Sequence, residues 1–552
     1  TKEARTLIGF SQVDFADGND VRADKLEWFE RQLGTGQVRG EHYFPELGNV
    51  WSELSDLKFN WRASYSEATR DAPYEREVIY EDTSGETRDF DGVFQIDSAR
   101  RNSTVFSKIE DDAQEIGTDV ELPLNVDFLP GKEATLSGGW TFYESNRDTL
   151  TKIYRFDGNL DPAIAQTRVD IIYGDSNIGP GLLQLREVGG SEFPEAFAGH
   201  LELDAFYFKA DLQLTNFLRV SGGVRYEDSL QTSDTLNFTL PDNGFTEAEI
   251  SSQYGLPSAS ATWNFTDNMQ LRAAYSQTIT RPQFRELAFV QFINSETDES
   301  FIGNPFLLNS EVENFDARWE YYFSPNEFVT LGVFHKDIDN PIEEVSFVFG
   351  DSSINSFINA PGATLSGFEA EIEKNLDFDE WFGWNFLGDR EIVLKANYAF
   401  TDSEVSTDGE VVRASAASGV PEADPTAAEN FIIDGRRLQG QSDHLFNLQL
   451  GYDNDIARSK FRILVNYASE RIRRAENRTA NIPAILEKIP TTVDLTYSRD
   501  FDFGSGEYEL SIKAQNILGE DYEAFQEGTN QEVIVDGYDR GTAISVGIKR
   551  RF

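Results

Sequence analysis

The chain has no cysteine, one methionine and only four histidines in 552 residues. The lack of cysteine excludes disulfide bonds, zinc–thiolate centres and cysteine nucleophiles. The histidines (His42, His200, His335 and His444) lie far apart in the sequence, which argues against a histidine-rich metal centre. No nucleophile elbow, metalloprotease helix or dinucleotide-binding loop is present. We therefore expect no catalytic residues, no metal ligands and no cofactor, and the sequence does not indicate an enzyme.

Long apolar runs are also missing, since none approaches the roughly 20 residues that a membrane helix needs. The 96 acidic and 48 basic residues give a formal net charge of −48, which excludes binding to a nucleic-acid backbone. So much acid forms either a solvated surface or a negative mouth that attracts cationic ligands. A membrane protein of this composition is possible only as a β-barrel, whose strands each show one apolar face.

What the sequence does contain is aromatic residues, with 43 Phe, 20 Tyr and 8 Trp, and alternation with a period of two. This alternation is typical of strands whose two faces meet different media. It predicts that one face turns to lipid and the other to the lumen of a barrel. The lipid face is expected to carry Val220, Leu394, Leu448, Ile463 and Ile512, and the lumen face Arg219, Lys395, Gln449, Arg462 and Lys513.

Tight turns alternate along the chain with long polar connections. The turns lie near residues 211–217, 263–269, 322–327 and 502–507, and the long connections near 144–195, 228–252, 281–311, 337–364 and 402–441. Short turns at one end and long loops at the other are typical of a transmembrane barrel. The predicted fold is all-β, a transmembrane antiparallel β-barrel of which this chain covers about 17 strands, and residues 1–552 form one domain. Aromatic girdles are expected to include Trp140, Trp263, Trp319, Tyr321, Trp381 and Trp384.

Several segments of the chain resemble one family of barrel proteins. They are Leu271–Leu287, Gly303–Leu307, Val333–Ile342, Leu438–Tyr452 and Asn516–Tyr522, followed by the terminal Phe552. In this order they are similar to the barrel domain of TonB-dependent outer-membrane receptors, over roughly Leu57 to Phe552. A final strand that ends on phenylalanine also resembles the signal that the outer-membrane assembly machinery reads, and this role falls to Phe552.

The resemblance implies a 22-stranded barrel in the outer membrane of a Gram-negative bacterium, with a plug domain inside it. It also implies active uptake of a scarce siderophore, vitamin or saccharide, with energy passed from the TonB complex through the plug. No plug is recognisable in this chain, and its first expected strand, Arg5–Phe10, enters abruptly. We therefore expect that the chain is the carboxy-terminal part of a longer receptor, whose plug and first strands lie upstream or on a partner chain.

Six aromatic residues of the long loops are candidate ligand contacts, because aromatic rings stack on sugars and on aromatic chelators. They are Phe289, Phe292, Phe301, Phe306, Phe347 and Phe349. Packing between loops would also explain them. Arg281-Pro282 and Gly303-Asn304-Pro305 instead indicate a strand end and a turn. The alternative function is a passive porin or a scaffold that binds other envelope proteins through its loops, and oxygen-rich loops also leave calcium binding open.

Overall fold

The computed structural model describes most of the chain. The described residues are 2–12, 20–45, 56–82, 94–96, 102–126, 130–131, 133–158, 160–187, 195–236, 246–293, 299–349, 352–376, 390–414, 425–478, 480–504, 506–528 and 532–551. The carboxy-terminal Phe552, the girdle candidates Trp381 and Trp384, and much of the polar stretch after Val412 lie outside them.

In the part of the chain that the structure describes, one antiparallel sheet of 20 strands contains most of the residues. Its long strands are β1 (Lys2–Gln12), β2 (Asp20–Tyr43), β3 (Lys58–Asp82), β5 (Ser103–Asn125), β6 (Glu133–Asp157), β8 (Ala196–Thr215), β9 (Leu218–Leu236), β10 (Thr246–Thr266), β11 (Met269–Thr280), β14 (Ser310–Ser324), β15 (Glu327–Asp339), β18 (Gly362–Leu376), β19 (Arg390–Ser406), β22 (His444–Asn454), β23 (Ser459–Ala468), β26 (Thr492–Phe503), β27 (Gly506–Gln515) and β30 (Ala543–Arg551). Two short strands, β4 (Phe94–Ile96) and β7 (Gln184–Glu187), extend it.

The remaining elements lie in the connections. They are α1 (Pro162–Ala165), α2 (Val169–Ile172), η3 (Asp175–Asn177), α3 (Phe284–Leu287), β12 (Gln291–Ile293), β13 (Ser300–Ile302), β16 (Ile342–Phe349), β17 (Ser352–Asn359), β20 (Val411–Val412), β21 (Thr426–Ala427), η5 (Ala428–Asn430), β24 (Arg471–Arg474), β25 (Ile485–Lys488), β28 (Tyr522–Glu527) and β29 (Glu532–Tyr538). None of the described helices has the length and apolarity to cross a membrane.

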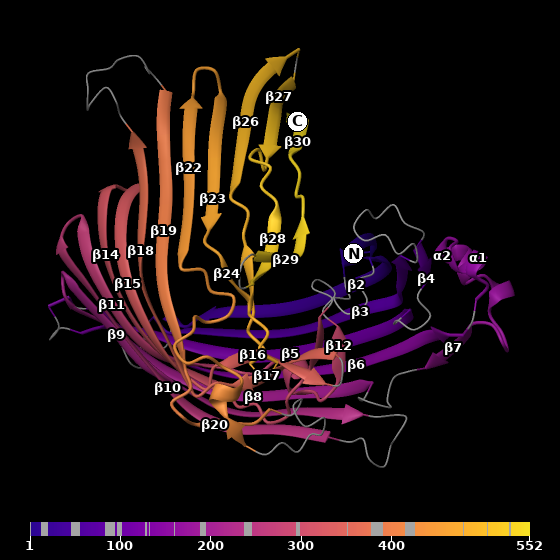
Figure 1. Ribbon diagram of the computed structural model, residues 1–552. Helices are drawn as coiled ribbons and strands as arrows, with labels where there is room; N and C mark the ends of the chain where they lie inside the picture. The colour runs from indigo at the N-terminus through magenta and orange to yellow at the C-terminus, as the bar shows by residue number, and fades with distance from the viewer. Residues whose placement is uncertain are drawn as a thin grey trace.

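The long strands follow one another in chain order, each pairing with the next, and together they curve into a wall (Figure 1). The 18 long strands are one more than the sequence analysis predicted. Within the described residues, β1 pairs only with β2 and β30 only with β27, so the wall has two unpaired edges. Figure 1 shows that the amino-terminal strands run steeply across the direction of the carboxy-terminal ones, as the twist of a large sheet produces.

Side chains alternate between two faces of the wall. Leu448 and Gln449 on β22 point to opposite faces, and Gln449 aligns with Lys395 on β19. The long connections pack against the face of Gln449, where the Leu438 amide donates to Ser403 Oγ at 3.1 Å. We call this the inner face and the opposite one the outer face. The two sets of residues predicted to face lipid and lumen lie on the outer and inner face respectively, as cross-strand register shows.

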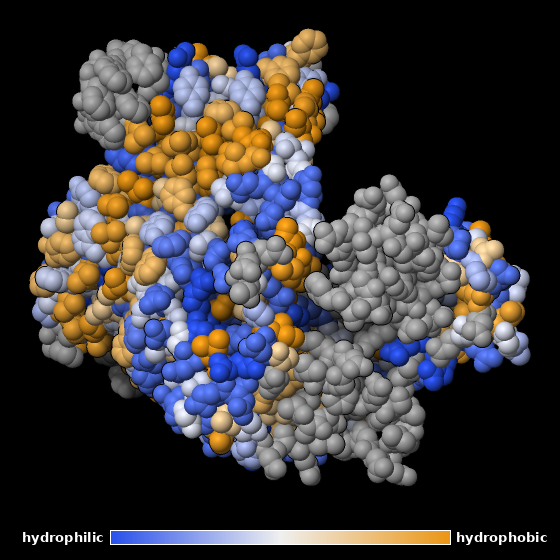
Figure 2. Space-filling view, in the orientation of Figure 1, coloured by the Kyte–Doolittle hydropathy of each residue, from blue (hydrophilic) through white to orange (hydrophobic). Residues whose placement is uncertain are grey.

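Large apolar side chains are exposed along the outer face. Examples are Phe206, Phe208, Val224, Tyr226, Leu331, Val333 and Phe368. Figure 2 shows apolar residues gathered over β19, β22 and β23. An exposed apolar band of this extent marks a surface that is covered in the working protein, and for a barrel the cover is lipid. At the turn end, Trp263 packs beside Phe265 and Trp319 beside Tyr321 on this face, as expected of a girdle.

The inner face is polar and carries ion pairs between strands. Arg272 Nε lies 3.2 Å from Glu320 Oε1, and Lys395 Nζ lies 2.5 Å from Glu373 Oε1. Charged side chains on one face and apolar ones on the other are what alternation with a period of two produces in a membrane barrel.

All four predicted tight turns join consecutive strands at one end of the wall, and the long connections lie at the other. Two long connections are shorter than predicted, because β6 continues to Asp157, β9 to Leu236, and β10 begins at Thr246. These extensions have polar residues on both faces, such as Asn146 and Arg147 on β6. Without an apolar face they do not resemble strands in the sequence.

Candidate functional site

Five long connections fold onto the inner face and onto one another. They join β11 to β14, β15 to β18, β19 to β22, β23 to β26 and β27 to β30, and their described parts are called the loop layer. Two small sheets link them, one of β12, β13, β17 and β16 and the other of β24, β25, β28 and β29. The connections are therefore a folded layer across the wall rather than separate loops.

An apolar core holds the loop layer together, and the predicted aromatic residues lie in it or near it. Phe289, Phe301 and Phe347 are buried. Phe292 stacks on Phe301 with ring centroids 5.4 Å apart, and the guanidinium carbon of Arg413 lies 5.4 Å from the Phe306 ring centroid. The sixth residue, Phe349, ends β16, and its side chain lies outside the described part. Phe289 and Phe347 thus pack in one apolar cluster and Phe292 and Phe301 in a second, while Phe306 lies against Arg413. The contact of these rings with a ligand stays a prediction.

Asn304, in the predicted turn Gly303-Asn304-Pro305, joins three connections. Its side chain is 1% exposed, and its Nδ2 donates to the carbonyl oxygens of Phe357 and Arg413, both at 2.8 Å. A Cβ at Gly303 would collide with the carbonyl oxygen of Ala288. The motif is therefore structural, as predicted, and it also fixes the connections to each other.

Replacing Asn304 by alanine should lower the free energy needed to open the loop layer by about 2 kcal/mol, because two buried carbonyl groups lose their donor. Hydrogen exchange of the amides in β17 and in residues 411–414 should become faster. Asn326→Ala, in the exposed turn between β14 and β15, is the matched control and should leave this exchange unchanged. Equal exchange in both variants would contradict the assigned role of Asn304.

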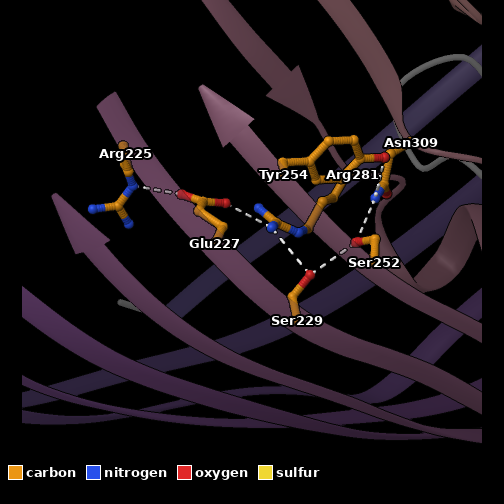
Figure 3. Close-up of polar contacts among 7 residues, drawn as sticks. All are labelled: Arg225, Glu227, Ser229, Ser252, Tyr254, Arg281 and Asn309. Atoms are coloured by element: carbon orange, nitrogen blue, oxygen red, sulfur yellow. Dashed lines mark hydrogen bonds and ion pairs between the residues drawn. The ribbon is translucent and has the colours of Figure 1, made fainter. Parts of the chain in front are cut away.

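Arg281 ties the start of the β11–β14 connection to the wall (Figure 3). Its Nη2 donates to Glu227 Oε2 at 2.7 Å and to Ser229 Oγ at 3.1 Å. The other carboxylate oxygen of Glu227 accepts from Arg225 Nε at 2.6 Å. One carboxylate thus bridges two guanidiniums, which makes a strong and directional contact between β9 and the strand end.

The far end of the same connection is held at the same place. Asn309 Nδ2 donates to Ser252 Oγ at 3.1 Å and to the Tyr254 hydroxyl at 3.3 Å. The Ser252 and Ser229 hydroxyls lie 3.0 Å apart, so the two anchor points form one network, as Figure 3 shows. The 27 residues between Arg281 and Asn309 are therefore clamped at both ends to β9 and β10.

A buried ion cluster joins three connections deeper in the loop layer. Arg436 Nη2 donates to Glu343 Oε2 at 2.8 Å, and these side chains are only 6% and 5% exposed. Glu476 Oε1 lies 3.7 Å from Arg436 Nε and accepts from the Ile433 amide at 3.1 Å. A charge pair this deep is stable only while both partners are present.

The cluster continues into the other two connections. Arg474 Nη1 donates to Glu299 Oε1 at 3.3 Å, and Arg473 Nη1 donates to Asp536 Oδ2 at 2.9 Å. The Tyr522 hydroxyl donates to Glu487 Oε2 at 2.6 Å. Burial and this carboxylate raise the pKa of Tyr522 to about 12, so the phenol remains a donor at neutral pH. All five connections are linked through charged or phenolic side chains.

Glu344 makes the loop layer sensitive to pH. Burial raises the pKa of Glu344 to about 8, and the nearby Glu299 carboxylate adds to the shift, while Gln439 and Arg474 oppose it. The folded layer therefore holds a proton that the unfolded chain, with an ordinary glutamate pKa of 4.5, loses earlier. The contribution of Glu344 to stability is complete below pH 4.5 and is lost as the pH rises towards 8.

Hydrogen exchange, corrected for its intrinsic pH dependence, should accordingly show weaker protection of β16 and β24 at pH 9 than at pH 6. Glu344→Gln keeps the neutral state at every pH and should reduce this difference. If the variant and the parent protein lose protection equally, the titration of Glu344 is not its cause.

Two cavities lie between the loop layer and the inner face. One, of about 400 Å³, is lined by residues of β3, β5, β6 and β8 and by residues 283–292. The other, of about 380 Å³, is lined by Thr280, Ser310, Val312, Ile338, residues 341–343 and residues 438–441. Both volumes are in the range of small-molecule sites.

No group of three or more acidic or histidine side chains that could hold a metal ion is found among the described residues. The arrangement contains no activated nucleophile within the described part, and its buried charges connect one loop to another. The loop layer covers part of the inner face and leaves cavities that are large enough for a small molecule.

Sequence reasoning missed the residues that join the connections, Arg436, Glu343 and Asn309. One signal was available: arginines occur close together at 436–437 and 471–474, within polar loops of a strongly acidic chain. Because arginines are scarce in this acidic chain, a cluster of them suggests that each has a specific carboxylate partner. Which carboxylates they bind depends on how five distant loops come together.

Comparison with known proteins identifies the architecture. The family model described as TonB dependent receptor-like, beta-barrel, matches residues 12–517. A search of curated protein sequences found no match.

Three solved structures of similar fold illustrate the likeness. The siderophore receptor PiuA from Acinetobacter baumannii is 11% identical with a TM-score of 0.52, and the match covers 100% of this chain and 80% of that one. The ferric citrate transporter FecA is 12% identical with a TM-score of 0.52, covering 100% and 76%. The ferric-catecholate import receptor Fiu from E. coli K12 is 12% identical with a TM-score of 0.51, covering 95% and 76%. At such identities the likeness concerns the fold.

Proposed function

The chain belongs to the TonB-dependent receptor-like β-barrel family, and from this membership we propose that it forms the wall of an active-uptake receptor in the outer membrane of a Gram-negative bacterium. The observation that carries the proposal is the loop layer. Five connections are linked to each other, and the one between β11 and β14 is clamped at both ends to the inner face, so folded protein lies over this part of the wall. A cover of this kind suits a receptor that captures its ligand before passing it inward.

The ligand class is a scarce solute of the siderophore, vitamin or saccharide type. A ferric chelate is the first choice, because the similar folds above include a siderophore receptor, a ferric citrate transporter and a ferric-catecholate import receptor. Outer-membrane lipid would cover the outer face. The TonB complex would act through a plug, and other envelope proteins are possible partners of the loop layer.

Uptake of radiolabelled ferric chelates, cobalamin and oligosaccharides by cells with and without the gene tests the proposal. We expect gene-dependent uptake of at least one of these ligands, and a protonophore should stop it, because active transport needs an energised inner membrane. Gene-dependent uptake that persists with the protonophore would favour the passive porin, and conductance in a planar bilayer would then be high.

Closure of the wall is part of the proposal. Unpaired edge amides and carbonyls each cost several kcal/mol in hydrocarbon, and β1 and β30 present such edges within the described residues. Additional strands, from the same polypeptide or a partner, would pair with them, and a plug would stand inside. The intact mass of the protein extracted from membranes, with any companion fragment, measures this directly.

The predicted roles of individual residues also remain proposals. Phe292 and Phe306 are half-buried, so their rings have surface left for a ligand, whereas Phe289, Phe301 and Phe347 would act by supporting them. Phe349 and the assembly signal Phe552 complete the predicted set.

A further inference from the structure

The cavity of about 400 Å³ lies between the inner face and residues 283–292, which form its roof. Its wall side is a row of residues paired across four strands, namely Arg70 on β3, Ile109 on β5, Thr149 on β6 and Phe197 on β8. The roof contributes α3 and β12, which the clamp at Arg281 holds against the wall. The cavity thus lies between four strands of the wall and one connection, which is held to the wall at both ends.

Three guanidiniums, from Arg70, Arg147 and Arg285, line the cavity together with one carboxylate, from Glu75. Arg147 is already neutralised, since its Nε and Nη2 donate to the two carboxylate oxygens of Asp111 at 2.5 and 2.9 Å. Lys25 Nζ lies 2.9 Å from Glu27 Oε1 and 3.6 Å from Glu75 Oε1, so two carboxylates share this ammonium, and the nearby Arg70 offsets the second of them. Positive charge therefore remains on Arg285, in a chain whose net charge is −48.

Arg285 is the guanidinium best placed to bind a ligand. It is an exposed residue of α3, and its guanidinium carbon lies 5.7 Å from the centroid of the Phe292 ring. Among the described residues no hydrogen bond or ion pair of its side chain is found. Its planar set of donors matches a carboxylate, which can accept two parallel hydrogen bonds.

A second polar group in the cavity is without a partner. Thr149 Oγ1 is buried and makes no hydrogen bond within the described part of the protein. Buried hydroxyls are normally hydrogen-bonded, so an unpaired one in a cavity wall indicates a missing partner. A hydroxyl can donate to an oxyanion.

Much of the remaining lining is apolar. It consists of Val105, Ile109, Ile153, Phe197, Val290 and Phe292. A small inorganic anion would leave this surface uncovered, whereas an organic anion would bury its body there and place its charge at Arg285.

We propose that this cavity binds an organic anion that carries a carboxylate on an aromatic or aliphatic body. Arg285 binds the carboxylate, Thr149 donates to it, and Phe292 and Phe197 contact the body. The inference rests on the proposed uptake function, to which it adds a site on the inner face under the loop layer and the class of its ligand.

Binding of 2-naphthoate to the full-length protein in lipid nanodiscs tests the proposal, with the uncharged 2-naphthalenemethanol as the matched probe. Arg285→Gln should weaken 2-naphthoate binding about tenfold, the usual value of one charged hydrogen-bonding group. Arg285→Lys should weaken it less, because lysine keeps the charge but loses the paired donors. Thr149→Val should weaken it several-fold. Arg168→Gln, whose side chain is 83% exposed beside Asp170 on the α2 segment, is the control and should change nothing.

No binding of 2-naphthoate at millimolar concentration would overturn the proposal, as would equal binding of the alcohol or unchanged affinity in folded Arg285→Gln. The assay needs neither TonB nor an energised membrane. A negative binding result therefore does not count against the uptake function, and a negative uptake result does not count against the binding site.

Discussion

Replacing Leu448 by arginine should prevent most of the protein from assembling into the membrane, whereas replacing the adjacent Gln449 by arginine should be tolerated. Leu448 lies on the outer face between Ala396 and Val465 on the neighbouring strands. A charge placed there would face lipid and cost about 2–4 kcal/mol near the middle of the bilayer. Gln449 lies on the polar inner face beside Lys395, where water and the carboxylates of the wall can solvate an arginine.

The two variants carry the same new side chain at adjacent positions. A difference in assembly between them therefore reports which face of the wall the arginine occupies. The folded fraction in isolated outer membranes, scored by heat-modifiable electrophoretic mobility, is the suitable measurement. Equal loss in both variants would mean that β22 does not separate lipid from lumen.

Replacing Arg436 by methionine should lower the free energy needed to open the loop layer by about 3–5 kcal/mol. This is the usual cost of removing one partner of a buried ion pair. The variant leaves Glu343, 5% exposed, and Glu476 without their guanidinium. Burial raises the pKa of Glu343, and protonation of this carboxyl relieves part of the cost, so the effect should grow as the pH rises. Hydrogen exchange of β16 and of residues 431–438 reports this opening.

The neighbouring Arg437 provides the control. It pairs with Asp443 at 3.1 Å, but both side chains are about one third exposed. Arg437→Met should therefore cost less than about 1 kcal/mol. Adding Glu343→Gln to Arg436→Met should restore part of the protection, because it removes the uncompensated charge. Similar exchange in the two single variants would show that the buried pair does not hold the layer.

Much of the wall could be predicted from the sequence alone. Alternation with a period of two is a local property, because each side chain on a strand points opposite to its neighbours. It assigned Leu394 and Lys395, and Ile512 and Lys513, to the correct faces without any knowledge of which strands pair. Turn residues such as Asn216 and Pro325 placed the short turns equally well. Local patterns failed to predict where some strands end. Beyond Glu144 and Asp228 the strands continue, although their residues are polar on both faces.

The loop layer was decided by the tertiary structure. The sequence indicated that Phe289, Phe301 and Phe347 lie in the long loops, but their burial requires connections far apart in the chain to meet. The contact of Arg436 with Glu343 spans 93 residues and that of Arg474 with Glu299 spans 175. In a chain with 96 carboxylates no local rule selects these partners. The faces of the strands and the turns follow from neighbouring residues. The buried ion pairs and the cavities form only when the tertiary structure brings distant connections and strands together.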